Sequence, residues 1–260
     1  MVWLNNKSKQ IALCLVLSVS VVIPLSGAPK NIVPQTGAIR NCVRAVVSGE
    51  EMVYISEENG TVSLNNLAGK TLWRNMSDNP AVMFEIIAHD LDGDKQDDLL
   101  GVSGNGSVYA WKSDGKLLWK FTTPEISRLS EIAVVGEDDE TRIFAGGNNF
   151  KIYELDSNGN LLSFIPIKGT VRILDAGYFV QNGKKDLFVL TYSHDKFRSE
   201  YMGFIDSVTK KEYRSSSISK FVKNSTMITD NTVADIDNDG KDDVIPVSYT
   251  HLRAHETGRN

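Results

Sequence analysis

The sequence predicts an all-β fold, a β-propeller made of four-stranded antiparallel blades. Three observations predict it: copies of one segment start at residues 53, 99 and 143, the turns inside each copy hold Gly and Asn at fixed places, and no long amphipathic helix is visible. Units of about 45 residues with four strands each are typical of propeller blades. We expect an incomplete ring of about four blades plus a started fifth, within residues 40–247.

The repeat is visible without gaps in residues 53–73, 99–119 and 143–163, and it continues in 187–213 and from 244 onward. Three columns keep one residue type in all three ungapped copies: Asn59, Asn105 and Asn149; Gly69, Gly115 and Gly159; Leu72, Leu118 and Leu162. A fourth column holds Trp73, Trp119 and then Ser163, and the longer hairpin of the fourth copy delays its aromatic residue to Tyr213.

The second copy shows how each unit divides into strands. Residues 99–102, 108–111 and 116–121 are apolar or alternating runs, and Asn105-Gly106 between the first two favours a type I′ turn. Residues 85–88 and 131–135 supply the strand before the second and third copies. Residues 122–130 are the best candidate for a short helix.

Two loops between the strands are dense in carboxylates, and each carries Asp at relative positions 1, 3, 5 and 9. Oxygen atoms spaced in this way suit Ca²⁺, which takes six to eight oxygen ligands. The carbonyl of the residue at position 7 adds a fifth ligand. The predicted calcium ligands are Asp90, Asp92, Asp94, Gln96 and Asp98 in the first loop and Asp235, Asp237, Asp239, Lys241 and Asp243 in the second.

Other interpretations of these loops are weaker. An EF-hand needs Glu at position 12, where this chain has Gly101 and Pro246, and zinc is disfavoured because neither loop contains His or Cys. The alternative is a solvated acidic turn without metal. The corresponding loops before Ile143 and Asp186 have lost most of their carboxylates, so we expect calcium at neither, and a structural rather than catalytic role at the two complete loops.

These residues carry a resemblance to known repeats. The loop D-x-D-x-D-x-x-x-D resembles the FG-GAP, or VCBS, repeat of secreted propellers, and residues 105–119 resemble the PQQ-like propeller repeat. The resemblance implies calcium in the two complete loops and a blade-to-blade packing role for the Gly and Trp columns. Lys95, which stands where the usual loop has Gly, departs from the pattern. No quinone site is recognisable.

The two ends differ from the repeats. Residues 1–27 combine Lys7 and Lys9 with the uncharged run 11–25, which predicts a cleaved signal peptide, the alternative being an uncleaved membrane anchor. Residues 248–260 show no strand alternation and resemble a non-native, read-through tail, the alternative being a native polar tail. We therefore expect a secreted, cell-surface or periplasmic protein with no membrane span after cleavage.

Composition restricts the partners. The formal net charge of −5 and the acidic pI argue against nucleic acid, which needs a basic face. The partners that remain are carbohydrate or another surface or periplasmic protein. We expect the protein to be a monomer. Trp111 either stacks on a sugar or packs between blades, with packing favoured, and His89 is expected to be an ordinary strand residue.

No catalytic or cofactor-binding residue is predicted, so whether the chain is an enzyme stays open, with a non-catalytic role favoured. The preferred function is a calcium-binding propeller that acts as a binding or scaffold module. One alternative is the N-terminal fragment of a calcium-dependent propeller enzyme, such as a rhamnogalacturonan-type polysaccharide lyase. A second is an outer-membrane assembly factor of PQQ-like fold.

Overall fold

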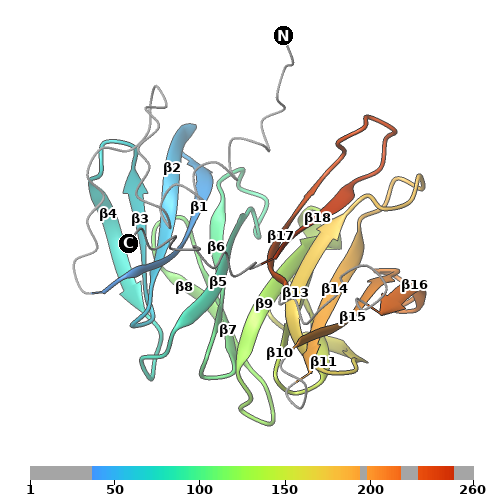
Figure 1. The fold of residues 1–260 in the computed structure, drawn as a ribbon. Helices are drawn as coiled ribbons and strands as arrows, with labels where there is room; N and C mark the ends of the chain where they lie inside the picture. Colours follow the sequence, from blue (N-terminus) through green and yellow to red (C-terminus); the bar gives the residue numbers. More distant parts are fainter. Residues whose placement is uncertain (1–36, 194–197, 218–227, 249–260) are drawn as a thin grey trace, which may run out of the picture.

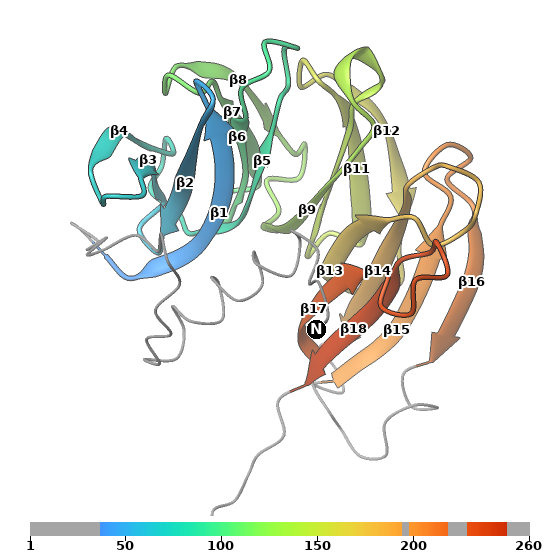
Figure 2. The same cartoon turned by 90° about the horizontal axis from the view of Figure 1, so that it is seen from above.

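The strands form separate blades arranged in an arc around a common axis. The computed structural model describes residues 37–193, 198–217 and 228–248. Figure 2 shows four sheets side by side, with a strand pair after the fourth and with β1, β5, β9, β13 and β17 on the inner side of the arc. Consecutive inner strands are in contact with one another. The predicted propeller of antiparallel blades, incomplete as a ring, is confirmed.

Each complete blade is a four-stranded antiparallel meander in chain order, and the last two strands begin a fifth blade (Figure 1). The strands are β1 Ile39–Val47, β2 Glu50–Glu57, β3 Thr61–Asn66, β4 Thr71–Met76; β5 Met83–His89, β6 Asp98–Ser103, β7 Ser107–Trp111, β8 Leu117–Thr122; β9 Leu129–Val135, β10 Arg142–Gly147, β11 Lys151–Asp156, β12 Leu161–Pro166; β13 Thr170–Gly177, β14 Asp186–Ser193, β15 Arg198–Ile205, β16 Glu212–Ser217; β17 Ile228–Ala234 and β18 Asp243–Ser248. Each of the first four copies recognised in the sequence supplies the second, third and fourth strands of a blade, and the copy from 244 onward supplies β18.

The apolar core lies between the blades rather than inside one sheet. The first cluster joins Tyr54 and Leu64 of the first blade to Leu99 and Tyr109 of the second, and three further clusters join each following pair of blades. Middle strands such as β6 and β7 are buried along their whole length because both of their faces meet a neighbouring blade. Stability of each blade therefore depends on its neighbours.

The Gly and Trp columns form a contact that is repeated between blades. The Trp73 indole N–H donates to the carbonyl of Ser113 at 2.8 Å, and a Cβ on Gly115 would lie 2.8 Å from the Trp73 ring. Trp119 repeats this arrangement, with Ser157 as acceptor at 2.8 Å and Gly159 beneath the ring. The glycine is required because its side-chain space is filled by the indole of the preceding blade.

The third junction replaces this contact by an ion pair. Ser163, which occupies the tryptophan position, donates to Glu154 at 2.5 Å. Lys210 of the fourth blade lies 2.5 Å from the same carboxylate and 4.9 Å from the centre of the Phe144 ring. Charge and cation–π attraction thus join the third blade to the fourth where the indole is absent.

Three local predictions are wrong. The turn at Asn105-Gly106 is not type I′, because the φ angle is positive only at Gly106, at 81°. Residues 122–130 form no helix: 122 ends β8, 129 and 130 begin β9, and 123–128 connect the two strands through a turn. Tyr213 lies one position before the tryptophan column, since Arg214 pairs with Phe204 as Trp73 pairs with Leu64.

Two predictions concern residues outside the described part. The signal peptide at 1–27 lies there, as does the suspect tail after Ser248, the last residue of β18. Within the described ranges the chain contains one short 3-10 turn, Asp138–Glu140, and no helix long and apolar enough to span a bilayer.

Candidate functional site

The first acidic loop connects β5 to β6 and turns back on itself around Asp90. The Asp90 carboxylate accepts the backbone N–H groups of Gly93 and Lys95 at 2.9 and 2.7 Å. Carboxylate oxygens of Asp90, Asp92 and Asp98 lie within 4.8 Å of one another. Oxygen atoms at this separation suit a cation with metal–oxygen distances of about 2.3–2.6 Å.

Two further residues of this loop, Asp94 and Gln96, have partners in the protein. Asp94 lies 3.1 Å from the ammonium of Lys112, which also contacts Asp92 at 2.5 Å. Gln96 donates its backbone N–H to Asp94 at 2.9 Å, and its side-chain oxygen accepts the N–H of Ser48 in the first blade. Of the four predicted aspartates of this loop, the structure thus brings the carboxylates of three together.

Asp98, at position 9, also has a structural task. It is fully buried and accepts the backbone N–H groups of Ser113 at 2.9 Å and Leu91 at 3.3 Å. Asp186 accepts the N–H of Ser207 in the fourth blade in the same way. Burial raises the pKa of the Asp98 carboxyl to about 7.

The second acidic loop connects β17 to β18, and its convergent carboxylates come from positions 1, 3 and 5 rather than 1, 3 and 9. Asp235, Asp237 and Asp239 bring carboxylate oxygens within 4.8 Å of one another. Asp243 accepts the N–H of Ile236 at 3.4 Å. Lys241 donates to Asp239 from its backbone at 2.9 Å and from its ammonium at 3.0 Å.

Position 8 of both loops carries an aspartate that the sequence analysis did not single out. Asp97 exchanges two hydrogen bonds with Val46 at the end of β1, and Asp242 does the same with Tyr178, which follows β13. Both aspartates therefore attach an acidic loop to the preceding blade. The signal in the sequence was the Asp-Asp pair that ends each loop.

A second candidate site lies at the axis, at the opposite ends of the inner strands from the acidic loops. Regular pairing skips one residue near the start of each complete blade's inner strand, and these residues are Arg40, Phe84, Ser130 and Arg172. Strand β17 has the same irregularity between Ile228 and Asp230. A bulge bends its strand and re-aims a side chain. All four skipped residues line one pocket of about 260 Å³.

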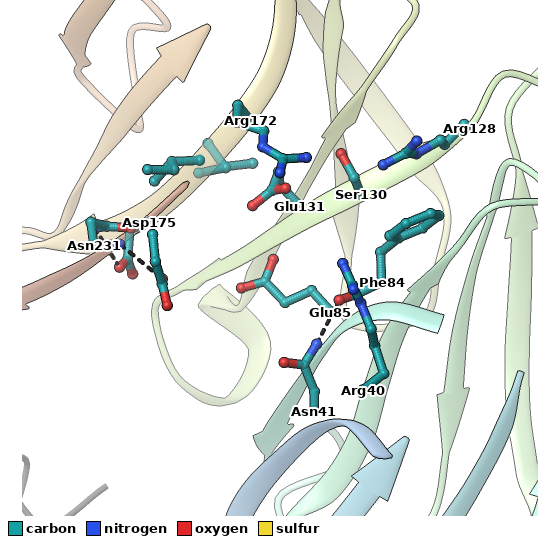
Figure 3. Close-up of a pocket in the computed structure, with 13 residues that line it drawn as sticks. Arg40, Asn41, Phe84, Glu85, Arg128, Ser130, Glu131, Arg172, Asp175 and Asn231 are labelled. Atoms are coloured by element: carbon teal, nitrogen blue, oxygen red, sulfur yellow. Dashed lines mark hydrogen bonds between the residues drawn. The ribbon is translucent and has the colours of Figure 1, made fainter. Parts of the chain in front are cut away.

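Figure 3 shows the charged groups that face this pocket. It is lined by three arginines, Arg40, Arg128 and Arg172, and by four acidic residues, Glu85, Glu131, Asp175 and Asp230. Side chains of the inner strands also cross between blades: Asn41 donates to the Phe84 carbonyl at 2.5 Å, Glu85 accepts the Ile132 N–H at 2.7 Å, and Asn231 donates to Asp175 at 3.2 Å. These bonds fix the wall of the pocket.

Burial changes the protonation of the pocket. It raises the pKa of the Glu85 carboxyl, and the nearby charge of Glu131 raises it further. The pKa values of Glu131 and Asp175 are likewise raised by burial. Paired carboxyls with raised pKa values are typical of functional sites, although structural networks also produce them.

Two further residues considered in the sequence have structural surroundings. Trp111 is buried and stacks on Tyr109 with ring centres 5.2 Å apart, so it packs between blades and presents no surface to a sugar. His89 ends β5 with Nε2 3.3 Å from the Thr141 hydroxyl, and burial lowers its pKa. His194 lies outside the described residues.

Comparisons with known proteins agree with the propeller. A family model described as the lambda-carrageenase beta-propeller domain matches residues 52–170. Lambda-carrageenases of Pseudoalteromonas sp. and of Pseudoalteromonas carrageenovora are 27% and 26% identical over 152 residues, which is 57% of this chain and 16% of each relative. The chain thus spans about one sixth of the length of these curated relatives.

Solved structures at low identity show the fold alone. The Saccharomyces cerevisiae Sqt1 structure superposes with a TM-score of 0.61 at 14% identity, covering 85% of this chain and 59% of Sqt1. The Neurospora crassa Pan2 WD40 domain gives a TM-score of 0.54 at 14% identity, covering 72% and 52%. Both likenesses support the propeller architecture.

Proposed function

We propose that this chain is the propeller part of a secreted polysaccharide-binding protein, and that the axial pocket binds a carrageenan-type galactan. The observation that carries the proposal is that the lambda-carrageenase propeller match, residues 52–170, includes β5 and β9. These strands supply Phe84, Glu85, Ser130 and Glu131 to the pocket. The export pattern at residues 1–27 supports secretion, because an extracellular polymer has to be met outside the cell.

The chemistry of the pocket suits a saccharide. Carboxylates and the amides of Asn41 and Asn231 accept and donate hydrogen bonds to hydroxyl groups, whereas apolar side chains contribute little to the lining. The cross-blade hydrogen bonds hold these groups in place before a ligand arrives, which reduces the entropy lost on binding. The pocket is also shared between blades, so a ligand would contact several repeats at once.

Calcium in the two acidic loops is the structural part of this proposal. Three convergent carboxylates per loop support it, and the ammonium of Lys112 beside Asp92 would compete with the ion in the first loop. Because the loops lie at the far ends of β5 and β17 from the pocket, bound calcium would stabilise the blades without touching the saccharide. The resemblance of the sequence to FG-GAP and PQQ-like repeats, which implies calcium in these loops, also supports this part of the proposal.

The binding proposal is tested by blocking the pocket. Affinity electrophoresis through gels containing lambda-carrageenan should retard the wild-type chain, and Asp230→Trp should abolish the retardation because Asp230 is an exposed residue of the pocket wall. Glu51→Trp, at an exposed β2 residue outside the pocket lining, is the matched control and should remain retarded. Equal retardation of Asp230→Trp and wild type would refute binding in the pocket.

A second candidate function is hydrolysis, favoured by Glu85 and Glu131. The charge of Glu131 raises the pKa of Glu85, so the pair favours one protonated acid beside one ionised carboxylate, which are the two forms that glycoside hydrolysis needs. Release of reducing ends that Glu131→Gln abolishes would support hydrolysis. An unsaturated product, seen by its ultraviolet absorbance, would instead support the lyase alternative, and binding without either product would support a non-catalytic module.

A further inference from the structure

Two arginines of the axial pocket, Arg40 and Arg128, lie on the side away from Asp175, whereas Arg172 lies beside Glu131 (Figure 3). Phe84 lies between the first two, with the Arg128 guanidinium 3.9 Å and the Arg40 guanidinium 5.4 Å from the ring centre (Figure 3). Asp175 and Asn231 form the other side of the pocket in the same view. Since both arginines contact the Phe84 ring, the ring orients the guanidiniums and is not a free stacking surface for a sugar.

Arg128 has a donor that the protein does not satisfy. Its Nε is buried, and no hydrogen-bond partner is found for it among the described residues. Neither Arg40, Arg128 nor Arg172 has a carboxylate within ion-pair distance in the described part of the chain. Basic groups elsewhere behave differently: Lys112, Lys120 and Lys210 each contact a carboxylate at 2.5 Å. A buried donor without a partner is costly unless a ligand completes it.

The three arginines also repel one another. Burial lowers the pKa of Arg128, and the positive charges of Arg172 and Arg40 lower it further, while Glu131 opposes the shift. An anion placed among them would relieve this repulsion. The planar guanidinium fork matches the oxygen spacing of a tetrahedral oxyanion and can bind two oxygens at once.

We infer that Arg128, together with Arg40 and Arg172, forms an oxyanion subsite that takes a sulfate ester of the bound saccharide. The identity of the saccharide in this inference rests on the proposed function, whereas the oxyanion subsite is argued from the arginines alone. Asp175 and Asp230 would repel a second anion on the opposite side and accept hydroxyl groups there. The pocket therefore selects a ligand with an anionic group at one end and hydroxyl groups at the other.

The subsite is tested first with inorganic sulfate alone. Arginine Nε–H resonances of the full chain are followed by NMR during a sulfate titration, and the Arg128 resonance is assigned by its loss in Arg128→Lys. A saturable shift is expected at Arg128 and none at Arg44, which pairs with Glu51 at 2.6 Å outside the pocket. Absence of a saturable shift at Arg128 would overturn the subsite.

The saccharide is tested by calorimetry with a sulfated galactan oligosaccharide and its chemically desulfated form. A charged hydrogen bond predicts that the sulfated form binds about 10- to 100-fold more tightly. Arg128→Gln should remove that difference and leave the weaker affinity for the desulfated form unchanged. Arg44→Gln, which removes the same charge elsewhere, should keep it. Arg128→Lys retains the charge but lacks Nε, so its affinity difference between the sulfated and desulfated forms should lie between those of Arg128→Gln and the wild type. This variant replaces Arg128→Gln in the test if Arg128→Gln does not fold.

The outcomes separate the two proposals. Equal binding of both oligosaccharides, with no sulfate effect on Arg128, would refute the subsite and leave saccharide binding intact. A saturable sulfate shift at Arg128 without binding of either oligosaccharide would support the subsite for a free oxyanion and refute the saccharide proposal. Binding of neither ligand would refute both.

Discussion

Gly159→Ala tests whether the repeated Gly–Trp contact holds neighbouring blades together. Gly159 has a φ of 79°, and a Cβ added there would lie 2.5 Å from two carbons of the Trp119 ring. The left-handed backbone alone costs an alanine about 1–2 kcal/mol. The ring would have to withdraw by several tenths of an ångström or more, which strains the packing by about 1–3 kcal/mol and stretches the 2.8 Å bond from the indole to Ser157.

The control separates the backbone from the contact. Gly49 has a φ of 75° and nothing within 4 Å of its added Cβ, so Gly49→Ala carries the backbone cost alone. We expect a destabilisation of about 3 kcal/mol for Gly159→Ala and about 1 kcal/mol for Gly49→Ala. Urea denaturation followed by tryptophan fluorescence measures both free energies of unfolding. Values that agree within about 0.5 kcal/mol, the scatter of ordinary surface substitutions, would refute the packing role of the glycine.

Three further predictions concern the loops and the pocket. Lys95→Gly should stabilise the protein by about 0.5–1 kcal/mol because Lys95 has a φ of 63°. Gly240 occupies the same position of the second loop with a φ of 83°, so Gly240→Lys should destabilise the protein. Thermal melts of both variants check the sign. Asp92→Ala should remove one calcium site in calorimetry and lower the melting temperature in millimolar calcium, and an equal melting temperature of the wild type in calcium and in EGTA would contradict a bound ion. Glu131→Gln should raise the melting temperature more at pH 8 than at pH 5. Because the pKa of Glu131 is raised in the folded protein, the folded state binds more protons than the unfolded state above the ordinary glutamate pKa, and wild-type stability falls as pH rises through that range. A change in melting temperature that is the same at both pH values would contradict this.

The blades were predictable from the sequence because their signals are local and recur. Gly69, Gly115 and Gly159 mark the same turn in three copies, and all three have positive φ angles. The strand boundaries predicted from these turns agree with the observed ones within one or two residues. The acidic loops were also predictable as units, but which of their carboxylates converge was not, because the arrangement depends on residues outside the loop such as Lys112, which follows β7 and contacts both Asp92 and Asp94.

The axial pocket was not predictable, for a physical reason. Its walls come from residues about 44 positions apart, and the bulge that aims them does not keep one residue type: the four complete blades carry Arg40, Phe84, Ser130 and Arg172. A repeat search finds columns in which residue type is kept, so it passes over a column in which only the backbone irregularity is kept. The pairing register of the folded sheets is needed to see that these residues are equivalent.

This contrast divides the repeat into two kinds of position. At the blade junctions, backbone geometry and side chain recur together, because the Trp73 and Trp119 rings demand a glycine beneath them. At the axis the bulge recurs in all five inner strands, while the bulged residue of the four complete blades is Arg, Phe, Ser and Arg. The bulge therefore belongs to the fold, and the side chains are free to serve a ligand. The chemistry particular to this chain should therefore lie in the bulged column and its neighbours, where unpaired arginines face a wall of carboxylates, and substitutions there should change binding more than blade stability.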